Sequence, residues 1–230
     1  EWAAFETKWE ELSKKNLRLI DIETYMDGNK RKYIGVWREG NDGHYLWAGQ
    51  EWSGFEAKWN ELSKKNLRLI DIETYMDGNK RKYTGDWRSG SDGHYLWAGK
   101  ERNGFKAKWK ELSGKNLRLV DVETYMDGSK RRYIGVWRAG SKGHSLWSGV
   151  DFENFTSKWA ENAQGKLRLI DIETYDSPCS NSCLNTALMP DDPAESGRSQ
   201  YNYWITGNGL HCENPHGSCR GNTSAVAYRW

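Results

Sequence analysis

The sequence predicts an α+β protein built of tandem repeats, each with one short helix and a three-stranded antiparallel meander. Three observations predict this fold class. A unit of about fifty residues recurs along the 230-residue chain, and residues 1–50 and 51–100 differ at only nine positions. Each unit begins with apolar residues at helical spacing. It continues with two runs of strand-forming residues around an Asp-Gly turn.

The helix of each unit is predicted from three apolar residues on one face. Phe5, Trp9 and Leu12 stand at positions i, i+4 and i+7, and Asn16 after them favours a helix stop. The same trio recurs as Phe55, Trp59 and Leu62 and as Phe105, Trp109 and Leu112. A helix of about three turns is marginal alone in water, so this apolar face must pack on the strands.

Three strands are predicted after the helix. The first is Leu17–Tyr25, which ends at the hairpin turn 26–29 with its Asp-Gly pair. The second is Arg31–Arg38, and the third is His44–Ala48, which follows a Gly-rich turn.

The second strand is predicted to have two different faces. Tyr33, Gly35 and Trp37 recur unchanged in the next unit, which indicates a core face. Positions 34 and 36 hold Ile and Val in the first unit but Thr84 and Asp86 in the second. We therefore expect the opposite face to be wet or to form an adjustable contact.

The pattern divides the chain into repeats 1–50, 51–100 and 101–150 and a modified repeat 151–230. The last departs from the pattern after Tyr175, and we expect two long insertions there, with Tyr201–Gly207 as second strand and Ala225–Trp230 as third. A separate small domain is the alternative. The repeats can close into a propeller-like ring or stack as an open solenoid, and we favour the ring because closure hides sheet edges.

All four cysteines, Cys179, Cys183, Cys212 and Cys219, lie in the modified repeat. An even number in a loop-rich segment predicts two disulfides and a secreted, extracellular protein. The alternative is a zinc site, because His211 and His216 lie near the cysteines and are suitable ligands. The cysteine spacings, however, match no standard zinc pattern. We expect no metal and no cofactor.

The composition of the chain limits the classes of partner that it is expected to bind. The chain carries 34 basic and 32 acidic residues, mixed in sign throughout, which disfavours nucleic-acid binding. It contains no run of 18 apolar residues, so no membrane span is expected. No signal peptide is visible, which fits a mature or trimmed form of a longer protein.

A pair of carboxylates recurs on the first strand of every unit and is a candidate ligand-binding site. Asp21 and Glu23 lie two residues apart and share one face. Their counterparts are Asp71 and Glu73, Asp121 and Glu123, and Asp171 and Glu173. Glycosidases use paired carboxylates as acid and base. The alternative is ion pairing with Arg18, Arg31 or Arg38. We assign no catalytic residue, because no nucleophile or metalloprotease motif occurs.

The aromatic residues are a second candidate binding surface. The chain has 14 Trp and 12 Tyr, and most of these rings must form the core. Trp2 and Trp52 become Arg102 and Phe152 in the later units, so this position is the best candidate for an exposed or interfacial aromatic. A sugar packs its C–H face on such a ring while its hydroxyls meet polar neighbours.

The strings KW-x-EL, LRLIDIETY, RKYIGVWR and HYLWAG resemble the Trp-rich bacterial tandem-repeat family, which is similar to the repeat domain of fungal polyglycine hydrolases. The resemblance covers residues 1–175. It implies a noncatalytic extracellular module that accompanies hydrolases. The S-x-x-K residues of the catalytic partner domain are absent from this chain, so the resemblance does not carry hydrolysis over.

Three functions follow as hypotheses. The first is a secreted, noncatalytic module that binds a repetitive extracellular polymer, such as a glycan or cell wall, through repeated surfaces. The second is a structural protein whose copies assemble into an oligomer or filament. The third is a hydrolase that uses the recurring carboxylates.

Overall fold

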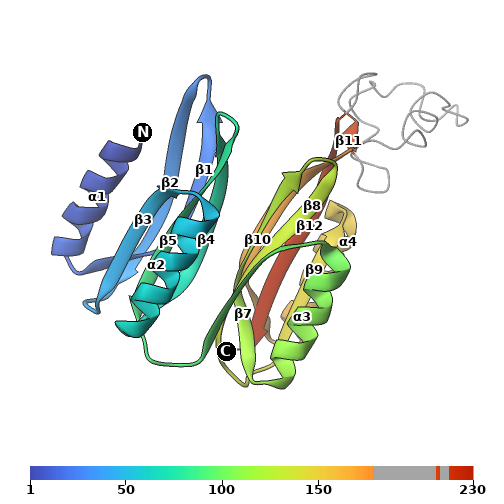
Figure 1. The fold of residues 1–230 in the computed structure, drawn as a ribbon. Helices are drawn as coiled ribbons and strands as arrows, with labels where there is room; N and C mark the ends of the chain where they lie inside the picture. Colours follow the sequence, from blue (N-terminus) through green and yellow to red (C-terminus); the bar gives the residue numbers. More distant parts are fainter. Residues whose placement is uncertain (179–210, 213–217, 230) are drawn as a thin grey trace, which may run out of the picture. The chain divides into compact units, whose positions relative to one another are not determined.

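The computed structural model describes residues 1–178, 211–212 and 218–229, and the chain divides into two compact units, Glu1–Ser141 and Lys142–Trp230. The first unit contains α1 (Trp2–Lys14), β1 (Leu17–Asp27), β2 (Lys30–Glu39), β3 (His44–Gln50), α2 (Trp52–Lys64), β4 (Leu67–Asp77), β5 (Lys80–Ser89), β6 (His94–Lys100), α3 (Arg102–Gly114), β7 (Leu117–Asp127) and β8 (Lys130–Ala139). The second contains β9 (His144–Val150), α4 (Phe152–Gln164), β10 (Leu167–Pro178), β11 (His211–Cys212) and β12 (Ser218–Arg229). The tandem arrangement of one helix with antiparallel strands is confirmed (Figure 1).

The helices end where the sequence predicted. After α1 the chain turns at Asn16, whose φ is +58°, and the corresponding residues Asn66 and Asn116 have φ values of +56° and +55°. Asn tolerates this left-handed conformation better than most residues, so it closes the helix at little cost. The apolar face packs inward, since Phe55 and Leu62 are fully buried.

In each complete three-stranded sheet, the third strand comes from the preceding sequence repeat. The strand orders are β3–β5–β4 and β6–β8–β7 in the first unit. In the second unit β9 lies beside β12, which lies beside β10. A folded module therefore comprises residues 44–89 rather than 51–100, because β3 completes the sheet on which α2 packs (Figure 1). Hydrophobic periodicity identifies a strand but does not say which neighbour it pairs with.

The predicted core face of the second strand is confirmed. Leu69 pairs with Trp87, and Ile72 pairs with Gly85, on the face that α2 covers. A Cβ on Gly85 would lie 2.7 Å from the Trp87 ring and 2.8 Å from Leu69 Cδ1. The tryptophan ring thus lies over the glycine, and this close approach explains why the Tyr-x-Gly-x-Trp pattern recurs.

The opposite face is exposed in the first repeat and buried in the next two. Ile34 and Val36 are 53% and 47% exposed, whereas Asp86 is fully buried and Val136 is 1% exposed. The cause is the preceding repeat, because β1 lies against β4 and β5, and β4 lies against β7 and β8. The expectation of a wet face is therefore wrong for the second and third repeats, where the contact alternative holds.

Within residues 1–141 the sheets remain separate and follow one another as an open stack. The closed ring that we favoured is not the arrangement of this unit. Closure is unnecessary because each repeat covers the edge that its predecessor leaves open.

The modified repeat differs from the prediction at its second strand. β12 pairs with β10 in the register that β2 adopts with β1, so Ala225 lies within the second strand rather than a third. The predicted strand at 201–207, together with Cys179 and Cys183, lies outside the described residues. None of the described helices combines the length and apolar character needed to cross a membrane.

Candidate functional site

The recurring carboxylates lie between consecutive repeats of the first unit. Among the described strands β1 pairs with β2 alone, which leaves backbone groups at its other edge. The Asp71 carboxylate from β4 accepts a hydrogen bond from the Ile22 backbone N–H at 2.6 Å. One repeat later, Asp121 accepts from the Ile72 N–H at 3.0 Å. Each aspartate thus caps an otherwise open strand edge of the preceding repeat.

The glutamates of this pattern reach the same interface. The Thr24 hydroxyl donates to Glu73 at 3.4 Å. Glu23 of the preceding repeat lies close enough to Glu73 for the two side chains to interact. Burial is the main cause that raises the pKa of Glu23, and the Asp21 charge adds to it. Because the pKa of Glu23 is raised in the folded protein, its contribution to stability is fully present below the unfolded pKa of about 4.5 and is lost as the pH rises through the folded pKa.

This burial limits what the carboxylates can do. Asp71, Glu73, Asp121 and Glu123 are only 5–7% exposed, so a polymer cannot reach them from solvent. Asp21 and Glu23 are half-buried at the first repeat. The structural alternative is therefore the better interpretation of the central pairs. Their contacts with backbone N–H groups and a threonine go beyond the arginine pairing that the sequence suggested.

We expect Asp71→Ala to lower the free energy of unfolding by about 1–3 kcal/mol, because the Ile22 N–H loses its partner in a buried interface. Asp21→Ala is the matched control, since burial raises the pKa of Asp21 and favours its neutral form. This control should be neutral or stabilising at neutral pH. Urea unfolding followed by circular dichroism measures both variants. Equal destabilisation by the two substitutions would contradict the capping role.

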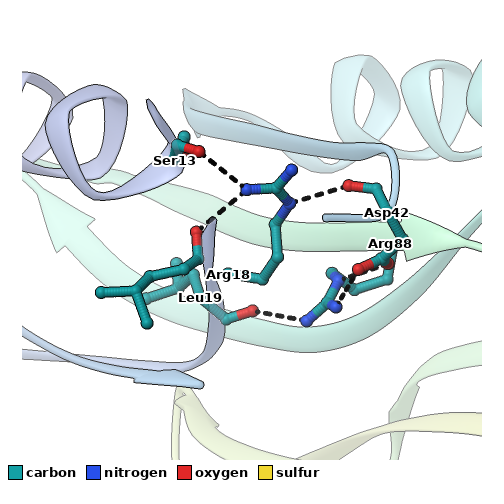
Figure 2. Close-up of polar contacts among 6 residues, drawn as sticks. Ser13, Arg18, Leu19, Asp42 and Arg88 are labelled. Carbon is teal, nitrogen blue, oxygen red and sulfur yellow. Dashed lines mark hydrogen bonds and ion pairs between the residues drawn. The ribbon is translucent and has the colours of Figure 1, made fainter. Parts of the chain in front are cut away.

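An arginine network joins the helix end, the turn and the next repeat, as Figure 2 shows. Arg18 Nε donates to the Asp42 carbonyl at 2.7 Å, and Arg18 Nη1 donates to the Ser13 carbonyl at 3.0 Å. Arg88 Nε donates to the Asp42 carboxylate at 2.8 Å, and Arg88 Nη1 donates to the Leu19 carbonyl at 3.4 Å. The hydrogen bond from Arg88 is the main cause that lowers the pKa of Asp42. Arg88 Nη2 also donates to the Asp42 carboxylate, and this bidentate pair fixes the start of β3 against β5.

The aromatic candidates Trp2 and Trp52 pack within their own modules. Trp2 meets Tyr33 edge-on with ring centroids 5.3 Å apart, and Trp52 meets Tyr83 in the same way at 5.2 Å. Both are half-buried. The exposed aromatic residue at this position is Phe152 of the fourth repeat, which is 60% exposed. The two tryptophans therefore extend the core and offer a ligand only part of each ring.

No group of three or more His, Cys, Asp or Glu side chains is placed to hold a metal ion in the part of the chain that the structure describes. His44 packs against Trp9 in a tilted arrangement with ring centroids 4.5 Å apart. Burial lowers its pKa, and the charges of Arg18 and Arg88 add to this effect. These contacts give His44 a packing role.

A surface that the sequence did not single out runs along the hairpin tips. We call it the tip row and define it as Tyr25, Met26, Met76 and Met126, whose side chains are 38–53% exposed. Consecutive tips are held together, since the Arg31 guanidinium lies 4.1 Å above the Tyr75 ring and donates to the Met76 carbonyl at 3.1 Å. Arg81 repeats the arrangement with Tyr125 and Met126. The signal in the sequence was the exact recurrence of Tyr-Met-Asp-Gly in three turns.

The fold and these contacts define a class of tandem-repeat proteins in which each module takes a strand from its predecessor and caps the edge of that predecessor. A family model described as "Polyglycine hydrolase-like, structural repeat" matches residues 1–40, 46–89 and 98–139, which together make up more than half of the chain. The chain therefore belongs to this repeat family, and the resemblance seen in the sequence is confirmed. The second and third matches end with the second strand, as the folded modules do. No curated protein matches the chain significantly.

Proposed function

We propose that the chain is a noncatalytic, extracellular module that binds a repetitive polymer, such as a glycan or cell wall, along the tip row. The observation that carries this proposal is that the same exposed surface recurs on three hairpin tips, and that contacts between the tips fix their relative positions. Three tips present Met26, Met76 and Met126, and the Arg31–Tyr75 and Arg81–Tyr125 contacts fix the neighbouring tips to one another.

The chemistry of the tips suits a polymer with alternating apolar and polar groups. Tyr25 and the methionines offer apolar contact, and the flexible thioether adapts to irregular partners. Asp27 and Lys30 are exposed beside them and offer an acceptor and a donor to hydroxyl or amide groups. Several weak contacts on one chain raise the overall affinity without any strong single site.

The central carboxylates support a noncatalytic role, because they hold the preceding repeat and are closed to substrate. The backbone register supports one of the two predicted disulfides, since Cys212 and Cys219 are direct partners on β11 and β12. Directly opposed residues in antiparallel strands have Cα atoms about 4.5–5.5 Å apart, within the range that a disulfide spans. A disulfide at this pair would accord with an extracellular location.

Binding is tested by retention of the full chain on insoluble cell-wall polymers and on a glycan array. We expect the triple variant Met26→Glu, Met76→Glu, Met126→Glu to reduce retention by about tenfold or more, because avidity multiplies the loss at each tip. A single Met76→Glu substitution should have a much smaller effect.

The control carries the same charge change on another repeated surface. Thr7, Ala57 and Ala107 are exposed and occupy one equivalent helix position in the first three repeats. Substitution of all three by Glu should leave retention unchanged. Equal retention of the tip variant and the helix variant would show that the tip row is not the binding surface. A wild-type chain retained by none of the polymers would contradict the proposed function itself.

A further inference from the structure

Two aromatic rings from the sheet fill the space under the helix in the modules 44–89 and 94–139. In the first of these, Trp87 packs against Phe55 with ring centroids 5.4 Å apart, and Tyr45 meets Trp87 edge-on at 6.2 Å. The next module repeats both contacts, at 5.5 Å and 6.2 Å. The two rings are cross-strand partners, so each sheet holds them side by side beneath its helix.

The fourth module, formed by β9, α4, β10 and β12, has neither ring at these positions. The register of β12 against β10 puts Ala227 at the position of Trp87. Its cross-strand partner is Ser145 of β9, which stands where β3 has Tyr45. The recurring Tyr-x-Gly-x-Trp pattern has become Thr-x-Ala-x-Ala at residues 223–227. Two large side chains are thus replaced by small ones at a single place in the fold.

The apolar residues that surround this place are uncovered in the fourth module. Leu169 and Ile172 of β10 are 36% and 40% exposed, whereas Leu69 and Ile72 are at most 1% exposed. Trp159 of α4 is 53% exposed. Truncation of large core side chains leaves such space when the surrounding elements keep their positions.

A pocket with about 260 Å³ of space, part of it open to solvent, lies at this place. Phe155 and Leu169 form part of its apolar wall, while Ser145 and Asn162 add a hydroxyl and an amide. Asn162 stands where the corresponding residue Leu62 is fully buried. The loss of the rings is therefore accompanied by a gain of hydrogen-bonding groups in the same wall.

A lysine over this site keeps one aromatic partner and lacks the other. Lys58 Nζ lies 4.5 Å from the ring centroid of Trp47 and 5.6 Å from that of Tyr45. In the fourth module Lys158 Nζ lies 4.9 Å from the ring centroid of Trp147, and both residues line the pocket. A ring bound in the pocket would restore the second cation–π contact.

We propose that this pocket binds a small molecule, or a substituent of a larger one, with a single planar aromatic ring that carries a hydroxyl group. The ring occupies the space that Trp87 and Tyr45 fill in the module 44–89. The hydroxyl group hydrogen-bonds to Ser145 or Asn162. A dry, apolar space left by a truncated core side chain binds a ring of matching size in the same way. This site is independent of polymer binding by the tip row.

The probe is p-cresol, which is the tyrosine side chain as a free molecule, titrated into the full chain by isothermal calorimetry. We expect saturable binding of one molecule per chain, with a dissociation constant of about 1 mM or tighter. Toluene should bind about fivefold more weakly, because it lacks the hydroxyl group. The non-planar 4-methylcyclohexanol should bind at least about tenfold more weakly, because it does not match the flat space left by a ring.

Variants that refill the pocket locate the site. Ser145→Tyr restores the ring of Tyr45 and should abolish p-cresol binding while the protein stays folded by circular dichroism. Asn162→Phe fills the same space from α4 and should also abolish binding, so the test does not depend on one variant. The matched control is Ala160→Tyr, which adds a ring at an exposed position of the same helix and should leave binding unchanged. Asn162→Leu should reduce the preference for p-cresol over toluene.

Three results would overturn the proposal. The first is the absence of saturable p-cresol binding by the wild-type chain. The second is equal binding of p-cresol and 4-methylcyclohexanol, which would show that the space does not select a planar ring. The third is unchanged p-cresol binding by the folded Ser145→Tyr or Asn162→Phe variant, which would place the binding elsewhere on the chain.

Discussion

Substitution of Trp87 by alanine is expected to lower the free energy of unfolding of the first unit by about 3–5 kcal/mol, since truncation of a fully buried tryptophan loses apolar contact and leaves a cavity. Trp87 is fully buried, packs against Phe55 with ring centroids 5.4 Å apart, and lies over Gly85. Its partner Tyr45 comes from the preceding repeat, so the loss also weakens the contact between modules.

The chain provides its own control for this substitution. Trp37 occupies the same position in the first repeat and packs against Phe5 at 5.6 Å, but it is half-buried because no described third strand lies beside β2. Trp37→Ala should therefore cost less than Trp87→Ala. Urea unfolding followed by far-ultraviolet circular dichroism compares the two without relying on tryptophan fluorescence. A larger loss for Trp37→Ala would contradict the role assigned to the third strand.

Substitution of Asp86 by valine is expected to stabilise the protein by about 2 kcal/mol at neutral pH, because it removes a buried polar group that lacks compensation. Asp86 is fully buried, and neither of its carboxylate oxygens has a hydrogen-bond partner among the described residues. Val136 fills the equivalent position of the third repeat and is 1% exposed. Its cross-strand neighbours Leu96 and Asp121 match the Leu46 and Asp71 that flank Asp86.

The gain should depend on pH in a defined direction. Burial is the main cause that raises the pKa of Asp86 well above its usual value of 3.8, so the fold favours the protonated form. The free-energy cost of burying the Asp86 charge is therefore absent while the pH lies below the pKa of Asp86 in the unfolded chain. This cost develops as the pH rises through the pKa of Asp86 in the folded protein. The advantage of Asp86→Val should shrink as the medium is acidified, which unfolding curves at several pH values would show.

The reciprocal substitution, Val136→Asp, provides the control. It should destabilise the third repeat by a similar amount at neutral pH, because it introduces the same carboxyl group at the equivalent buried position. A stabilising Val136→Asp, or an Asp86→Val variant weaker than the wild type at neutral pH, would show that the carboxylate is compensated in the fold.

The local elements could be predicted because their signals are local. The spacing of Phe5, Trp9 and Leu12 identified a helix, and Asp27-Gly28 marked a hairpin between two strands. The recurring Tyr-x-Gly-x-Trp pattern identified the core face for a steric reason that the Trp87–Gly85 contact shows. These features depend on residues close together in sequence or directly opposed in one hairpin.

The candidate site could be predicted only in part. Residue type singled out Asp71 and Glu73 as candidates for ligand binding or for arginine pairing, but it could not show that their partners are a backbone N–H and a threonine of the preceding repeat. Trp2 was selected because it varies between copies, whereas the structure packs its ring on Tyr33. The tip row escaped notice because exposure of Met26 and Met76 cannot be read from composition.

The sequence by itself determined the repeat, its helix, its strands and the family to which the chain belongs. Only the tertiary structure decided which repeat each strand completes. A strand such as β3 has the same hydrophobic pattern whether it pairs with β2 or β5, and the choice rests on long-range contacts such as Asp42 with Arg88. That choice separates the sequence repeat 51–100 from the folded module 44–89.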